Sequence, residues 1–254
     1  MEALANLSPL IAHADGVIRG TFVILLAASI GSWTLILMRL VSGVRQRRAS
    51  RGFLTHFWRA ASIEEIAQWL RGRGVTDPFS HLVHHGFNAV DTLRTRGREV
   101  AGVIASASPD EFLTRALRRA IEQDRTRLEN GLTFLASVAS IAPFVGLFGT
   151  VWGIYHALSA ISAAGTNTLE AVAGPVGEAL IMTGVGLAVA IPAALAYNLI
   201  ARENAKTLSQ LNAFAYDVFA FLSTGVKTDL GSQDARQTGE RVMSLAARTR
   251  GQVA

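Results

Sequence analysis

Two threonines lie within long stretches of the sequence that contain no charged residue. Thr150 belongs to the stretch 130–169, and Thr183 belongs to the stretch 179–201. At helical spacing, small residues share one face with each threonine. The face around Thr150 carries Ala139, Ala142, Gly146, Gly153 and Ala157, and the face around Thr183 carries Ala179, Gly186, Ala190 and Ala194.

These two faces have two possible interpretations. In lipid, small residues let helices pack closely, so the faces can form a packing seam in which each hydroxyl bonds its own backbone. Alternatively, if the two helices run in opposite directions, both threonines lie about 10 Å below the outer membrane boundary. Two hydroxyls at one level would then form a polar ring if several copies surrounded an axis. Because one three-helix chain cannot bury every small residue of both faces, we expect a homo-oligomer.

Glu178 is a third residue that could do chemistry, since it borders the third apolar span at its outer end. A carboxylate there can stabilise a helix N-terminus in contact with headgroups and water. It can equally serve as a proton relay, because ionisable residues within membranes usually mark pathways. On a helix Glu178 is not on the face of Thr183, and both interpretations stay open.

Three apolar stretches are long enough to position these residues inside a membrane. The chain of 254 residues is 50% hydrophobic and only 17% charged, and about 20 helical residues cross about 30 Å of hydrocarbon. The sequence therefore predicts an all-α integral membrane protein with transmembrane helices at 20–38, 132–157 and 176–201. Pro143 and Pro192 are expected to kink the second and third helices.

The distribution of positive charge predicts the orientation of these spans. Arginines follow the first span at Arg39, Arg45, Arg47, Arg48 and Arg51, and Arg202 and Lys206 follow the third. The positive-inside rule places 39–131 and the C-terminus in the cytoplasm, and 1–19 and 158–175 in the periplasm. Nucleic-acid binding is the rival explanation of the basic segment, but orientation alone already requires this clustering. No cofactor or metal site is predicted, since the sequence has no cysteine and its histidines, including His84-His85, lack metal-ligand spacing.

The segments flanking the spans are predicted to be helical. Ser62 to Glu65 and Ser108 to Glu111 both fit a capping box, the second with a proline at the first helical position. From Glu111 we expect one helix of about 50 residues that continues into the second span. The third helix should extend through 202–226, with an apolar stripe at Ala205, Leu208, Leu211, Ala215 and Phe219. Residues 227–254 are polar and are expected to form a flexible tail.

Two blocks of sequence resemble the MotA/TolQ/ExbB proton-channel family. The first block runs Ala142-Pro143-Phe144-Val145-Gly146-Leu147-Phe148-Gly149-Thr150-Val151-Trp152-Gly153-Ile154. The second, from Gly177 to Asn198, is similar to the third span of that family, although Gly177, Met182 and Gly184 stand where alanines are more typical. Bulky Met182 therefore raises the question of how a pore would pack beside Thr183.

Within the family, three spans indicate the ExbB or TolQ branch over the flagellar MotA branch. Pro143-Phe144-Val145 and His13-Ala14-Asp15 resemble the ExbB branch, whereas Phe57-Trp58 and Ala196-Tyr197-Asn198 resemble TolQ. The ExbB branch is favoured. Its members energise outer-membrane import of iron–siderophore complexes, and the alternative is the TolQ subunit of the Tol-Pal system.

The resemblance implies an inner-membrane homopentamer that encloses the transmembrane helices of an ExbD-like dimer, with a TonB-like protein outside. Thr150 and Thr183 would line the proton path, but a threonine hydroxyl cannot hold a proton near neutral pH. The carrier implied by the family is an aspartate of the central partner. A proton moving down about 150 mV releases roughly 3.5 kcal/mol, which can drive rotation of the central helices.

Two other classes of protein fit the sequence poorly. An intramembrane hydrolase needs a nucleophile, a base and an orienting acid, yet Ser159 and His156 have no acid near them in the membrane helices and no Gly-x-Ser-x-Gly is present. A solute transporter generally shows inverted repeats and broken helices, which the sequence lacks. We therefore predict that the protein is not an enzyme.

Overall fold

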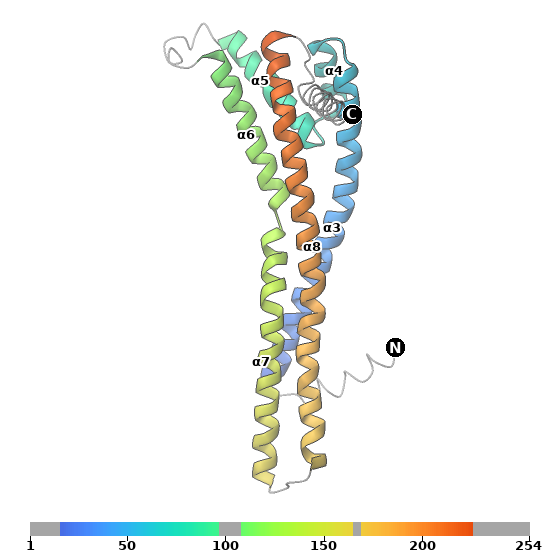
Figure 1. Ribbon diagram of the computed structural model, residues 1–254, viewed down its shortest axis with the longest axis vertical. Coiled ribbons are helices and arrows are strands. Elements are labelled where there is room, and N and C mark those ends of the chain that lie inside the picture. Colours follow the sequence, from blue (N-terminus) through green and yellow to red (C-terminus); the bar gives the residue numbers. More distant parts are fainter. Residues whose placement is uncertain (1–15, 97–107, 165–168, 226–254) are drawn as a thin grey trace, which may run out of the picture. The chain divides into compact units, whose positions relative to one another are not determined.

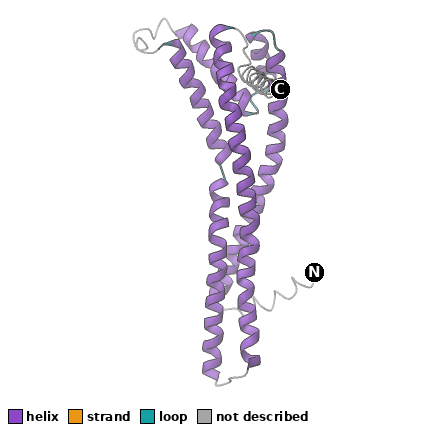
Figure 2. Ribbon diagram, in the orientation of Figure 1, coloured by secondary structure: helices purple, strands orange, loops and turns teal. Residues whose placement is uncertain are grey.

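A computed structural model describes residues 16–96, 108–164 and 169–225, and every regular element in these ranges is a helix (Figure 2). The helices are α3 (Gly16–Arg59), α4 (Ile63–Arg73), α5 (Pro78–Arg96), α6 (Pro109–Glu129), α7 (Leu132–Ala164) and α8 (Leu169–Thr224). The predicted flexible tail 227–254, and residues 1–15 of the predicted periplasmic segment, lie outside the described residues.

Within the described ranges, three helical stretches are long and apolar enough to cross a membrane. They lie in α3, in the consecutive helices α6 and α7, and in α8. This agrees with the all-α prediction of three spans. Contacts divide the described residues into two compact units, the first formed by those up to 42 together with those in 129–203, and the second by those in 43–128 together with those from 204 onward.

The first unit is built from α3, α7 and the first part of α8. Figure 1 shows α7 and this part of α8 side by side, and the short connection between them makes them run in opposite directions. Their shared core contains Leu25, Leu135, Val138, Ala142, Met182, Val189, Ala190 and Ala193. Large apolar side chains also cover the outside, among them Trp33, Phe144 and Leu195. Helices that are apolar all round are typical of membrane spans.

The expected single helix from Glu111 through the second span is interrupted. α6 ends at Glu129 and α7 begins at Leu132, because Gly131 has a left-handed φ of 81° that few other residues adopt. The Arg39 guanidinium donates a hydrogen bond to the Asn130 carbonyl, and the side chain of Leu35 occupies the space beside Gly131. The prediction of one helix was wrong because it overlooked Asn130-Gly131, a strong turn signal.

The predicted loop at 158–175 is mostly helical. α7 continues to Ala164 and α8 already begins at Leu169, so only 165–168 lie outside the described residues. Alanine is the commonest residue in this stretch, and alanine is the strongest helix former. The connection between the second and third spans is therefore mostly helical, and its place in the periplasm stays a prediction.

The second unit packs helices around a core of aromatic residues. The rings of Phe57 and Phe214 lie 4.8 Å apart, and those of Phe79 and Phe214 lie 5.5 Å apart. The unit contains the predicted capping box of α4, in which the Glu65 amide donates to Ser62 Oγ and Glu65 Oε2 accepts from the Ala61 amide. At the start of α6 the Glu111 amide donates to Ser108 Oγ. Both predicted helix starts are confirmed.

The continuation of α8 past residue 201, as far as Thr224, is confirmed. Its apolar stripe matches the predicted one only in part, since Leu211 is buried and Ala215 and Phe219 pack against the same core. The most buried residues of this part are Leu211, Phe214, Val218 and Phe221. Ala205 is exposed and Leu208 is only partly buried. The residues of α8 that become buried depend on the helices that pack against it, and in the second unit these differ from the neighbours of the membrane span.

Candidate functional site

The two threonines singled out in the sequence face one another across α7 and α8. Thr150 Oγ1 and Thr183 Oγ1 are 2.5 Å apart. Thr150 Oγ1 also lies 3.2 Å from the carbonyl oxygen of Gly146 on its own helix and 3.1 Å from that of Ala179 on the other. Thr150 is 5% exposed, whereas Thr183 is only partly buried. The Thr150 hydroxyl thus contacts both its own backbone and the neighbouring helix.

These contacts limit how the two hydroxyl protons can be arranged. Each hydroxyl has one proton to donate and can accept two hydrogen bonds. If Thr150 donates to a carbonyl, Thr183 must donate to Thr150, and rotation of both O–H bonds reverses the direction. The pair is therefore a short polar chain that holds no charge. In a membrane one such interhelical bond contributes on average about 0.6 kcal/mol.

Backbone contact between α7 and α8 brings the threonines this close. A Cβ built on Gly186 would lie 2.7 Å from the Ala142 carbonyl oxygen and 3.0 Å from Gly146 Cα. A Cβ on Gly146 would lie 2.7 Å from the Met182 carbonyl oxygen. Because the nearest atoms belong to the backbone and cannot rotate away, only glycine fits at both positions.

Further along the same contact, Gly153 packs on Ala179. A Cβ added to Gly153 would lie 2.9 Å from the Ala179 Cβ, and Ala190 is buried in the core of the unit at 4% exposure. Most residues of the two small-residue faces therefore bury one another within one chain. Ala139, Thr183 and Ala194 are only partly buried, and the expected homo-oligomer stays a prediction.

Met182 points into the core of its own chain. It is 4% exposed, and a Cβ on Gly149 would lie 3.3 Å from both Met182 Cβ and Met182 Cε. The same position on Gly149 is 3.4 Å from Thr21 Oγ1 of α3. Gly149 thus provides the space in which a side chain larger than alanine fits beside Thr183.

Three other predicted site residues lie in the same helices. Pro143 and Pro192 are partly buried, and α7 and α8 each continue through them. Their kinks stay a prediction. Glu178 belongs to α8, but its side chain lies outside what the structure describes, so its role also stays a prediction.

Comparison with known proteins shows that the segment containing this contact between α7 and α8 matches a known family. Residues 77–213 match the MotA/TolQ/ExbB proton channel family. Biopolymer transport protein ExbB of Neisseria meningitidis is 39% identical over 214 residues, which cover 84% of this chain and 95% of that protein. The chain belongs to the MotA/TolQ/ExbB proton channel family. The matched range contains α5, α6, α7 and most of α8, and therefore both threonines.

Relatives in this family come from two branches. ExbB of Xanthomonas campestris pv. campestris is 39% identical over 201 residues, which are 79% of each chain. The Tol-Pal system protein TolQ of Haemophilus influenzae is 36% identical over 200 residues, covering 78% of this chain and 85% of that protein. With its three membrane-length helices, this MotA/TolQ/ExbB member is a multi-pass protein of the inner membrane.

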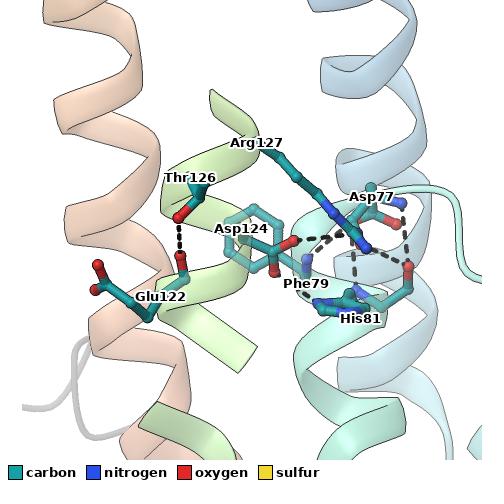
Figure 3. Close-up of polar contacts among 8 residues, drawn as sticks. Asp77, Phe79, His81, Glu122, Asp124, Thr126 and Arg127 are labelled. Carbon is teal, nitrogen blue, oxygen red and sulfur yellow. Dashed lines mark hydrogen bonds and ion pairs between the residues drawn. The ribbon is translucent and has the colours of Figure 1, made fainter. Parts of the chain in front are cut away.

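A second polar site lies in the other unit and was not found from the sequence. Figure 3 shows His81 of α5 and Asp124 of α6 pointing toward one another. His81 Nδ1 and Asp124 Oδ2 are 2.9 Å apart, and the two residues are 8% and 3% exposed. Arg127 Nη1 lies 3.7 Å from Asp124 Oδ1. Burial raises the pKa of Asp124, while the hydrogen bond and charge of His81 and the charge of Arg127 oppose that increase.

The sequence did carry a signal for Asp124. The buried face of α6 consists of Leu113, Leu117, Ala120, Asp124 and Leu128. An acidic residue at an apolar helical position is almost never fully buried without a partner. Its partner lies 43 residues away, so no local pattern could identify His81. Among the described residues, no group of three or more His, Cys, Asp or Glu could hold a metal ion.

Proposed function

We propose that this chain is the ExbB-type subunit of an inner-membrane motor that couples proton flow to a TonB-like protein. In this role it energises outer-membrane import of iron–siderophore complexes and similar substrates and performs no enzymatic reaction. Five copies surround the transmembrane helices of an ExbD-like dimer. Protons pass between that dimer and the surrounding ring.

The contact between Thr150 and Thr183 is the observation that carries this function. A packing seam needs only small residues, and Gly146 with Gly186 already brings the backbones together. The two hydroxyls add a polar chain at mid-helix, and Thr183 is not completely buried within the chain. The pair is therefore available to a group on a central partner.

The chemistry of the pair suits a lining role. A threonine hydroxyl can donate to an ionised carboxylate and accept from a protonated one, so it solvates both states of a partner aspartate. It does not take up the proton itself. A proton that crosses about 150 mV releases roughly 3.5 kcal/mol, which the partner carboxylate converts into movement of the central helices.

The outer faces of the first unit support assembly with other chains. Phe144 on α7 and Leu180 and Leu195 on α8 are each more than half exposed within one chain. Such faces need lipid or protein as cover, and a ring of five around a dimer supplies both. The arginines after the first span support an orientation with the N-terminus in the periplasm and the second unit in the cytoplasm.

Orientation can be tested with single cysteines. A cysteine at Arg94, in the second unit, should be shielded from an impermeant reagent added outside intact spheroplasts. A cysteine at Thr166, in the connection between α7 and α8, should react. Equal labelling at both positions would contradict the orientation.

The two branches can be separated by complementation. Matches to ExbB proteins at 39% identity slightly exceed those to TolQ proteins at 36% and 35%. Expressed with its own genomic partners, the chain should restore growth on iron–siderophore complexes to cells that lack ExbB. Restoration only of detergent resistance in cells that lack TolQ would assign it to the Tol-Pal system.

The hydroxyl pair is tested by Thr150→Val and Thr183→Val. Valine nearly matches the shape of threonine but lacks the hydroxyl, so the seam is kept while the polar chain is removed. We expect either variant to stop siderophore uptake and leave the copurified oligomer intact. Normal uptake by both variants refutes the proton-path role, and loss of the oligomer together with uptake reassigns the pair to packing.

A further inference from the structure

The His81–Asp124 pair is a titratable site that the proton path through α7 and α8 does not use. A hydrogen bond of 2.9 Å between His81 Nδ1 and Asp124 Oδ2 joins α5 and α6 of the second unit, and neither residue is more than 8% exposed. A buried carboxylate is unfavourable unless it is neutralised or fully hydrogen-bonded. The presence of this carboxylate at a buried contact between α5 and α6 therefore needs an explanation.

The surroundings favour keeping a proton at this site. Asp77, at the start of α5, is 5% exposed and caps the helix through Oδ2, which accepts from the amides of Phe79 and Ser80. Among the described residues, no group hydrogen-bonds the buried Asp77 Oδ1. The charge of this second buried carboxylate raises the pKa of Asp124 and so makes its ionisation less favourable.

We propose that Asp124 and His81 form a proton-binding site whose occupancy controls how firmly α5 docks on α6. A proton bound at Asp124 neutralises the buried carboxylate, and His81 Nδ1 can still donate to its carbonyl oxygen. Loss of that proton leaves a buried charge that His81 and Arg127 compensate only in part. If the second unit faces the cytoplasm, as the proposed function requires, the site responds to protons on the side that receives them.

The sign of the effect follows from the direction of each pKa shift. An unfolded Asp124 has a pKa near 3.9, about that of a model peptide. Burial raises the pKa of Asp124 in the folded chain. At pH values between the unfolded and the folded pKa, the folded chain binds more protons than the unfolded chain, so docking weakens as pH rises. If opening releases one proton, the equilibrium constant for opening changes by about tenfold per pH unit between these two pKa values.

Protonation of His85 has the opposite effect on docking, so the experiment must separate it from protonation of Asp124. Its ring lies 4.5 Å from the ring of His81. Burial lowers the pKa of His85, and the charges of His81, His84 and Arg119 lower it further. Below about pH 6.5 the unfolded chain therefore binds more protons at this position, and acid weakens docking.

Charged groups on the other helices of the unit complete the surroundings. The adjoining helix α8 contributes the buried Asp217, and α3 contributes the partly buried His56. Neither residue is altered in any of the variants compared below.

Hydrogen–deuterium exchange measured by mass spectrometry tests the site directly. The full-length protein, purified with its partner, is labelled between pH 4.5 and 7.5, with labelling times corrected for intrinsic exchange. In the wild type, protection of peptides from α5 and α6 should increase on acidification. Asp124→Asn should abolish this increase and leave only the acid-induced loss due to His85, and Asp124→Asn with His85→Asn should be flat. His84→Asn, an exposed change on the same helix, is the matched control and should keep the increase that depends on Asp124.

Two results would overturn the site. One is a His85→Asn variant, free of the opposing effect, whose protection does not increase on acidification, and the other is an Asp124→Asn variant that keeps the increase. If Asp124→Asn fails to assemble, His81→Asn decides, because its amide can replace Nδ1 as donor but carries no charge. The response should then move to higher pH, and an unmoved response refutes the site. Exchange requires no transport, so this failure is distinct from failure of the proposed motor function.

Discussion

Replacing Gly186 by alanine is the sharpest test of the contact between α7 and α8. The added Cβ would lie 2.7 Å from the Ala142 carbonyl oxygen, whereas ordinary contact begins at about 3.4 Å, so the helices must separate by about 0.7 Å. The same separation lengthens the 3.1 Å contact from Thr150 Oγ1 to the Ala179 oxygen to about 3.8 Å, beyond hydrogen-bond range.

A matched control comes from Gly184 on the same helix. Nothing lies within 4 Å of a Cβ built there, so Gly184→Ala adds helix propensity without crowding. Both substitutions gain about 0.5–1 kcal/mol from the loss of glycine flexibility. This gain cancels in the comparison, and the difference in unfolding free energy is the cost of overpacking, about 1–3 kcal/mol.

Thermal unfolding of the purified oligomer in mild detergent measures this difference. For a chain of this size about 1 kcal/mol corresponds to roughly 2–4 °C, so Gly186→Ala should melt several degrees below Gly184→Ala. Siderophore uptake should fall only in Gly186→Ala, because only that variant displaces Thr150. Equal melting temperatures and equal uptake would refute the close backbone contact.

Three further substitutions give separate expectations. Ser62→Ala removes the cap of α4 and should lower local stability by about 1 kcal/mol, seen as faster hydrogen exchange in 61–73, while Ser62→Thr should not. His81→Leu leaves the buried Asp124 carboxylate without its donor and should lower unfolding free energy by about 1–3 kcal/mol at pH 7; unchanged urea unfolding would show that the bond contributes little. Glu178→Gln should reduce siderophore uptake while the oligomer copurifies normally, and full uptake would leave only the helix-anchoring role.

The membrane spans and helix starts could be predicted because their signals are local. A charge-free run of about 20 residues has few alternatives to a transmembrane helix. A serine followed three residues later by glutamate supplies both halves of a cap. The same kind of local reasoning would have found the helix break, since Asn130-Gly131 was available and was not used.

The pairing of surfaces could not be predicted, because a helical period shows which residues share a face and not what covers it. Thr150 and Thr183 were placed at the same depth, but their direct hydrogen bond depends on backbone contact at Gly146 and Gly186. His81 and Asp124 likewise come from different helices. Only the tertiary arrangement brings such groups together, so the second polar site required the structure.

Direct backbone contact at Gly146 and Gly186 has a mechanical consequence for a motor. Side chains in a contact can change rotamer and absorb strain, but peptide groups in van der Waals contact cannot. At this crossing α7 and α8 therefore resist sliding and separation and behave as one stiff element. In the proposed motor, movement during turnover would then occur at surfaces outside this crossing, and the pair would act as a stationary wall against which a partner can turn.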